Sequence, residues 1–257
     1  MMFVDTHAHL QWPDYQNNLE EIYSRAFEAQ VNKMIVVGTE IKNLERALSL
    51  ASSKDFLWAS VGIHPHDVKD IQEPQDLNFL KEKAKHPKVV AIGETGLDYF
   101  YEHSDRELQK KYFAKQIQIA LDFKKPLIVH SRKAPDDTIA VLKEGEADKV
   151  GGVAHCFTEE LPFAKKLLDF GFYISFTGII TFKKKVEYLH DVVRYVPLEN
   201  ILLETDCPYL TPEPHRGKTN EPAYLRLTAL KIAELKNVTL EEVANTTTAN
   251  AGKLFGI

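Results

Sequence analysis

Two histidines one residue apart, His7 and His9, stand at the end of the first apolar run of the chain. Side chains alternate between the two faces of a strand, so both imidazoles would point the same way and could share a metal ion. Imidazole and carboxylate groups bind zinc and manganese, and carboxylates also bind magnesium. Further groups of these kinds stand near the ends of later apolar runs: Glu94, His130, His155 and Asp206. Together they predict the divalent-metal centre of a hydrolase.

The number of candidate ligands exceeds the three or four that one ion needs, so we expect two ions with a bridging carboxylate. Glu94 is the best candidate for the bridge, because its position lies between the two sets of histidines. Two neighbouring ions suit hydrolysis at phosphorus or at a carbonyl, and Asp206 can serve as both ligand and general base. The expected ligands are His7, His9 and Asp206 for the first ion, and His130 and His155 for the second.

The identity of the ions stays open among magnesium, manganese and zinc. Four histidines favour zinc, manganese or another transition ion over magnesium, which prefers oxygen ligands. Glu204 lies two residues before Asp206 and shares its face of the predicted strand. We expect Glu204 to orient a metal ligand rather than to bind the metal itself.

Three further residues are candidates for substrate binding. His64 ends a third apolar run in a segment rich in turn residues, and we expect it to contact substrate. Arg132 and Arg216, the latter in the loop Pro214–Lys218, could bind an anionic group such as a phosphate. His66, in contrast, is interpreted as a structural histidine.

The elements that must position these residues alternate along the chain. Several apolar runs are almost uninterrupted, for example that from Met34 to Val37, which is typical of strands covered on both faces in a parallel sheet. The predicted strands are Phe3–His9, Lys33–Thr39, Leu57–His64, Val89–Thr95, Pro126–Ser131, Gly151–Phe157, Tyr173–Gly178 and Ile201–Cys207. Apolar side chains at helical spacing predict helices over Asn18–Gln30, Leu44–Ser52, Asp105–Lys124, Asp136–Glu144, Glu160–Phe170, Lys183–Tyr195, Glu221–Lys236 and Thr239–Phe255.

Eight strands alternating with helices predict an α/β fold, a (β/α)8 TIM barrel. A doubly wound open sheet is the rival, but no Gly-x-Gly-x-x-Gly turn follows the first strand, so a dinucleotide site is unsupported. Catalytic groups of a barrel sit at the C-terminal ends of its strands, which would bring the six ligands to one mouth. The Pro-rich segment Pro208–Pro222 is followed directly by helical sequence, so residues 1–257 are predicted as a single domain.

Composition narrows the classes of function. The chain has 257 residues, of which 44% are hydrophobic and 27% charged, and its formal net charge is −5. This charge argues against a protein that coats nucleic acid by bulk electrostatics, but not against local contacts with a few phosphates. No signal peptide and no apolar stretch of about 20 residues is visible, so a cytoplasmic protein without a membrane partner is expected. The two cysteines, Cys156 and Cys207, are expected to point away from the ligands into the core.

The segments that carry the candidate ligands resemble the TatD family of metal-dependent deoxyribonucleases. The matching segments span nearly the whole chain and occur in the order typical of the family. Taken together they are specific for it, although no single segment would be. The segments are Phe3–Leu10, Val61–His66, Ala91–Tyr99, His130–Arg132, His155–Phe157, Leu203–Leu210 and Arg216–Pro222.

The resemblance implies a (β/α)8 fold and a divalent-metal site made of the same six residues. It also implies nuclease activity on DNA, often as a 3′–5′ exonuclease, and single strands or strand ends are the expected substrate, with no obligate protein partner evident. The alternative is a metal-dependent hydrolase of a carboxylic ester or amide, either a small molecule or an aminoacyl nucleic acid. A catalytically idle scaffold is a third class, but it predicts lost ligands, and all six are present.

Overall fold

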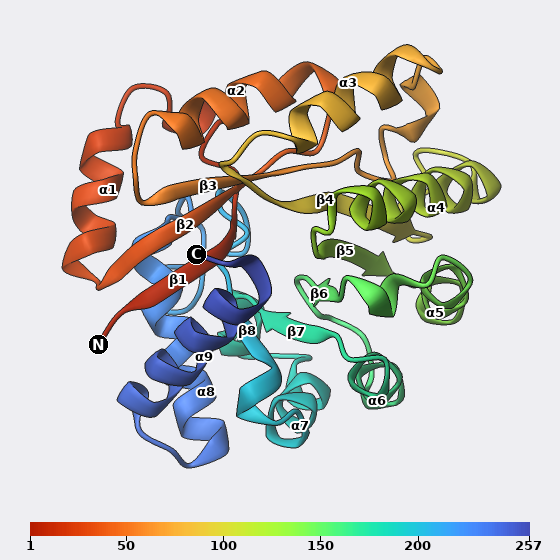
Figure 1. Cartoon of the computed structure of the whole chain (residues 1–257). Helices are drawn as coiled ribbons and strands as arrows, with labels where there is room; N and C mark the ends of the chain where they lie inside the picture. The colour runs from red at the N-terminus through yellow and green to blue at the C-terminus, as the bar shows by residue number, and fades with distance from the viewer.

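A single eight-stranded sheet organises the computed structural model, which describes residues 1–257, and the order of its strands follows the sequence from β1 to β8. All neighbouring strands are parallel, and a parallel bridge between Ala8 and Cys207 closes the sheet into a barrel. Figure 1 shows helices around the strands on the outside. The strands are β1 (Phe3–Ala8), β2 (Val31–Val37), β3 (Leu57–Val61), β4 (Val89–Asp98), β5 (Leu127–Arg132), β6 (Gly152–Ala154), β7 (Tyr173–Phe176) and β8 (Ile201–Leu203). The predicted (β/α)8 fold is therefore confirmed.

The uninterrupted apolar runs are explained by burial on both faces of the strands. Met34 and Val36 belong to the large outer core between the strands and the helices, whereas Ile35 and Val37 belong to a separate apolar cluster. That second cluster takes side chains from nearly every strand, as expected for the packed interior of a barrel. Phe255, near the C-terminus, packs against it.

Nine α-helices accompany the strands. Most begin and end within a few residues of the predicted positions, and Thr239 caps the last helix by accepting a hydrogen bond from the backbone N–H of Glu242 at 3.1 Å. The helices are α1 (Leu19–Glu28), α2 (Ile41–Ser52), α3 (Gln75–Ala84), α4 (Arg106–Phe123), α5 (Pro135–Glu144), α6 (Leu161–Asp169), α7 (Glu187–Tyr195), α8 (Leu225–Lys236) and α9 (Leu240–Phe255). None of them combines the length and the apolar surface that a bilayer crossing requires.

Two parts of the helix prediction were wrong. Helix α3 was not expected, because its sequence is mostly polar and it buries only Leu80 and Ala84 completely. The lysine run 183–185 was expected to start a helix, but α7 begins only at Glu187. In both places the apolar pattern is too weak to mark the helix boundary.

The strands also end at other residues than predicted. β4 runs on past Glu94 to Asp98, whereas β6 and β8 stop at Ala154 and Leu203, before His155 and Asp206. The loop after β8 is still hydrogen-bonded to β1, since the backbone N–H of Asp206 donates to the carbonyl of His7 at 2.9 Å. The candidate ligands of β6 and β8 therefore lie in the loops directly after the strands.

A buried carboxylate holds the two ends of the barrel together. Asp5 of β1 accepts hydrogen bonds from the backbone N–H of Thr205 at 3.0 Å and from its hydroxyl at 2.6 Å. Asp5 also accepts from the backbone N–H of His7 at 3.2 Å. Because the Asp5 side chain is fully buried, these contacts fix the approach of the loop after β8 to the end of β1.

Candidate metal centre

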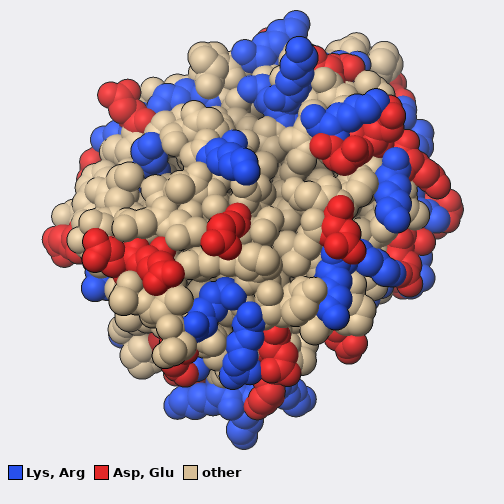
Figure 2. Space-filling view, turned by 60° about the horizontal axis from the view of Figure 1, so that its bottom comes forward, with Lys and Arg blue, Asp and Glu red and all other residues tan.

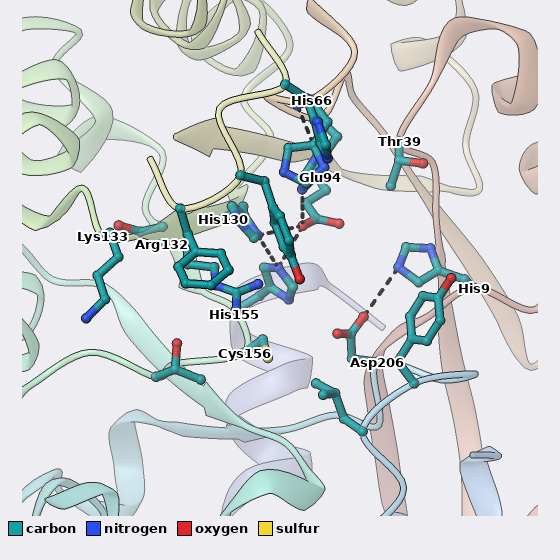
Figure 3. A pocket seen from close by; sticks show the side chains of 18 of the residues that line it. His9, Thr39, His66, Glu94, His130, Arg132, Lys133, His155, Cys156 and Asp206 are labelled. Atoms are coloured by element: carbon teal, nitrogen blue, oxygen red, sulfur yellow. Dashed lines mark hydrogen bonds and ion pairs between the residues drawn. The ribbon is translucent and has the colours of Figure 1, made fainter. Parts of the chain in front are cut away.

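The six predicted ligands converge at the C-terminal ends of the strands, as Figure 3 shows for those it labels. They surround the base of a cavity of about 1060 Å³, whose wall includes His9, Glu94, His130, His155 and Asp206. His7 lies behind this wall and is fully buried. His7 and Asp206 are 199 positions apart in the sequence, and they reach one site because the barrel closes.

The first group of donor atoms lies between the start and the end of the barrel. The Nε2 atoms of His7 and His9 are 3.3 Å apart. The Oδ1 atom of Asp206 lies 3.4 Å from His9 Nε2 and 3.7 Å from His7 Nε2. These three residues are the ones expected to hold the first ion.

Glu94 joins this group to a second one. Its Oε2 atom lies 3.3 Å from His7 Nε2, and its Oε1 atom lies 2.8 Å from His155 Nε2 and 3.1 Å from His130 Nδ1. His64 Nε2 is also near Oε1, at 3.3 Å. The two carboxylate oxygens of Glu94 therefore face different sets of histidines, which is the arrangement that a bridging ligand requires. His64, expected to contact substrate, stands among the second set.

The donor set fits divalent ions. Three groups of three ligand atoms lie within 4.8 Å of one another: His7, His9 and Glu94; His64, Glu94 and His130; and His7, His155 and Glu204. All these side chains are buried or nearly so, and their contacts are mainly with one another. Nitrogen and carboxylate donors in this proportion suit zinc or manganese better than magnesium.

The charges of the site are coupled. Burial by itself would raise the pKa of the Glu94 carboxyl, but the surrounding His155, His64 and His130 hold it well below its usual value. Burial lowers the pKa of His64 to about 4, so this imidazole is neutral at pH 7. Burial opposes a charge on His155 as well, but Glu94 and Glu204 raise its pKa well above the usual value. An incoming ion must displace this proton, because only neutral imidazole binds metal.

Glu204 lies beside His155, and its role in orienting a metal ligand stays a prediction. Its Oε1 atom is 3.5 Å from His155 Nδ1 and accepts a short hydrogen bond from the backbone N–H of Cys156. The ring of His155 stacks on that of His7 with centroids 4.0 Å apart. The Glu204 carboxylate is close enough to orient His155, and it could also bind an ion together with His7 and His155.

Asp98 faces His130 as Glu204 faces His155, and this contact was not predicted from the sequence. Its Oδ2 atom lies 3.1 Å from His130 Nε2 and 2.9 Å from His66 Nε2. Burial alone would raise the pKa of Asp98, but these imidazoles and backbone N–H groups hold it far below its usual value. His66, interpreted as structural, in fact lines the cavity. The signal was present, since Asp98 follows Glu94 by four residues in β4 and so shares its face.

We predict that Asp98→Asn weakens metal binding about 10-fold to 100-fold, because the amide cannot hold the His130 ring as a carboxylate does. Titration of metal-free protein with zinc, followed by calorimetry, measures the change. The matched control is Asp137→Asn, because Asp137 accepts a hydrogen bond from Tyr99 nearby but lies outside the cavity. Equal zinc affinity in Asp98→Asn and wild type would exclude the positioning role.

The model of the family described as TatD related DNase matches residues 4–256. The chain belongs to the TatD family. TatD-family relatives are named metal-dependent hydrolases; one of them, YabD of Bacillus subtilis, is 44% identical over 256 residues, with both chains covered completely. Another, from Escherichia fergusonii, is named 3′-5′ ssDNA/RNA exonuclease TatD and is 33% identical, with 98% of each chain covered.

Solved structures agree with this membership. The crystal structure of YJJV, a TatD homologue from Escherichia coli K12, superposes with a TM-score of 0.93 at 31% identity and covers 99% of this chain and 98% of its own. A TatD-family hydrolase from Entamoeba histolytica gives a TM-score of 0.89 at 23% identity, covering 99% and 98% of the two chains. At that identity the likeness supports the fold alone.

Of the two arginines expected to bind substrate, only one lines the cavity of this TatD-family protein. Arg132 lines the cavity. Arg216 does not: its guanidinium stacks on Phe182 at 3.9 Å and donates to the carbonyl of Thr211 at 3.0 Å. Basic and acidic side chains are interspersed on the face shown in Figure 2, without a broad area of one sign. The lysine and arginine side chains that line the cavity are Lys69, Arg132 and Lys133.

One cysteine departs from its expected place. Cys207 is buried in the core, as predicted, but Cys156 lines the cavity. Strand alternation does not apply to Cys156, because β6 has ended and its backbone is left-handed, with φ of 45°. Asp206 is left-handed too, with φ of 53°. Left-handed backbone at two site residues indicates local strain that the surrounding contacts maintain.

Proposed function

We propose that this protein hydrolyses phosphodiester bonds of nucleic acid, with single-stranded DNA or strand ends as substrate, using two divalent ions. The observation that carries the proposal is the placement of Glu94, whose two oxygens face two separate sets of histidines. His7, His9 and Asp206 would hold one ion, and His130 and His155 the other, with Glu94 between them. The donor chemistry favours zinc or manganese.

When bound, two such ions would lower the pKa of a water molecule and offset the negative charge of a phosphate group. The residue best placed to take the proton of the attacking water is Asp206. Its side chain is 16% exposed and borders the cavity, so substrate can reach it. Burial would raise its pKa, but the hydrogen bond with His9 and the charge of His7 lower it below the usual value. The carboxylate is therefore ionised and ready to act as a base.

The cavity wall supports a nucleic-acid substrate. Phe100, Tyr101 and Tyr209 line it, and they are the most exposed of the large hydrophobic side chains in this chain. Exposed aromatic rings stack with unpaired bases, which favours single strands over duplex. The relative named as a 3′–5′ exonuclease on single-stranded DNA and RNA supports the same substrate class and suggests that direction of cleavage.

The test is degradation of single-stranded DNA labelled at its 5′ end by purified protein loaded with manganese or zinc. We expect shortening from the 3′ end, a ladder of labelled products, and complete loss of activity in EDTA with recovery when metal is returned. Label at the 3′ end provides the control for direction, because it should be released at once. Intact DNA, with folded and metal-loaded protein, would refute the proposal and favour hydrolysis of a carboxylic ester or amide instead.

A further inference from the structure

The guanidinium of Arg132 lines the cavity without a partner of opposite charge. It forms no ion pair and donates no side-chain hydrogen bond to any protein acceptor. Instead it packs on two aromatic rings, with its Cζ atom 4.1 Å from the centroid of Phe100 and 4.8 Å from that of Tyr101. The two rings stand at 90° to each other beside the guanidinium, whose unpaired N–H groups suit bidentate binding of a phosphate.

The position of Arg132 relates it to the metal centre. Both His130 and Arg132 belong to β5, and alternation places them on the same face, two residues apart, or about 7 Å along the strand. His130 contacts Glu94 at the base of the cavity, so Arg132 lies on the same wall nearer the mouth.

The two aromatic residues are exposed but firmly placed. Phe100 is 54% exposed and Tyr101 is 52% exposed. The backbone N–H groups of both donate to Oδ1 of the buried Asp98, each at 2.9 Å. Gln109 holds the backbone of Asp98 in turn, accepting from its N–H at 2.8 Å. Large exposed rings on a loop tied down in this way form a preorganised surface, which reduces the cost of binding.

We propose that Arg132, Phe100 and Tyr101 bind the nucleotide next to the one at the metal centre. The guanidinium binds the phosphate that is not cleaved, and the rings stack with a base. This inference rests on the proposed function and deepens it: the substrate is a strand with at least one phosphate beyond the scissile bond. Asp98 contacts His130 through one oxygen and holds the aromatic loop through the other, so it connects the two sites.

The first experiment compares two substrates. One is an eight-residue oligothymidylate, and the other is bis(p-nitrophenyl) phosphate, which has a single phosphate. For Arg132→Gln we expect kcat/KM on the oligonucleotide to fall about 10-fold to 100-fold, since a charge-assisted bidentate contact is lost. On the small diester the fold-decrease in kcat/KM should be at least about five times smaller, because that substrate has no second phosphate for Arg132 to bind. The slope of log kcat/KM against log salt should decrease by about 0.7, as expected for one fewer contact with a single-strand phosphate.

The matched control is Arg106→Gln. Arg106 also stacks on an aromatic ring, with its Cζ atom 4.3 Å from the centroid of Tyr99, but it lies outside the cavity. Arg132→Lys serves as a second variant, because lysine keeps the charge and loses the planar fork, so we expect partial recovery. Thermal unfolding of each variant shows whether a change in activity reflects lost stability.

The second experiment measures stacking without turnover. An oligonucleotide with 2-aminopurine, whose fluorescence is quenched on stacking, is titrated into metal-free protein in EDTA. We expect quenching on binding, and in the Phe100→Ala/Tyr101→Ala double variant about tenfold weaker affinity with little quenching.

The outcomes separate the two proposals. If the wild type cleaves DNA but Arg132→Gln lowers kcat/KM by the same factor on both substrates, the neighbouring site is refuted and the proposed nuclease activity is supported. Binding and quenching that depend on Arg132 and the two rings, without any cleavage, would support the neighbouring site and refute the nuclease. Absence of both binding and cleavage would refute both.

Discussion

Replacement of Asp206 by asparagine is expected to lower the rate of DNA cleavage about 10³-fold, within the range typical of lost general acid–base catalysis. Asparagine has nearly the same shape and keeps a carbonyl oxygen at the position that faces His9 and His7. It cannot accept a proton from water near neutral pH, however. The variant should therefore fold normally and retain most of its metal while losing turnover.

The rate is best measured in a single turnover, with enzyme in excess over end-labelled single-stranded DNA, so that product release does not hide the chemical step. Metal per chain is measured on the same sample. Asp67→Asn is the matched control, because Asp67 also lines the cavity but, unlike Asp206, its carboxylate does not pair with His7 or His9. Cleavage by Asp206→Asn within about threefold of wild type would contradict the assignment of the base, since it is far from the 10²-fold minimum expected.

Replacement of Glu94 by alanine is expected to remove at least one ion per chain and to abolish detectable cleavage. Glu94 is 4% exposed and stands between both sets of histidines, so no other carboxylate can take over both of its contacts. Its loss also removes the carboxylate oxygen beside His130 Nδ1 and His155 Nε2. We therefore expect a larger effect on metal content than from any other single ligand.

Metal content after gel filtration, measured by mass spectrometry, checks this prediction directly. Glu40→Gln is the matched control, because Glu40 lines the same cavity but pairs with Lys42 and Asn43 instead. Unchanged metal content in Glu94→Ala would exclude Glu94 as the bridge. Loss of both ions would show that each set of histidines depends on it.

These two variants give different signatures, which makes the mechanism testable in parts. Asp206→Asn should retain metal and lose the chemical step, whereas Glu94→Ala should lose metal first. Returning a large excess of metal should restore some cleavage to Glu94→Ala only if its main defect is affinity. It should restore none to Asp206→Asn, because the missing group is a proton acceptor.

Much of the fold and of the candidate site could be predicted from the sequence, because two local rules apply widely. Strand alternation places His7 and His9 together wherever the backbone is extended, and the same rule places Arg132 with His130. Uninterrupted apolar runs indicate strands buried on both faces, and here Met34 to Val37 are all fully buried. Eight such strands between helices are enough to predict the barrel, and hence the meeting of ligands from distant segments.

Only the tertiary structure decided how these residues face one another. Strand alternation ends with the strand, and the left-handed turns at Cys156 and Asp206 direct their side chains through contacts with neighbouring segments. The division of Glu94 between two sets of histidines depends on barrel closure. The link from Asp98 to both His130 and the aromatic loop depends on packing between β4, β5 and the loop after β4. The exclusion of Arg216 from the cavity wall depends on its contacts with Phe182 and Thr211, in the loops after β7 and β8. Residue type and spacing thus determined which groups could react, whereas long-range packing determined their orientation, since side-chain direction outside regular strands has no local period.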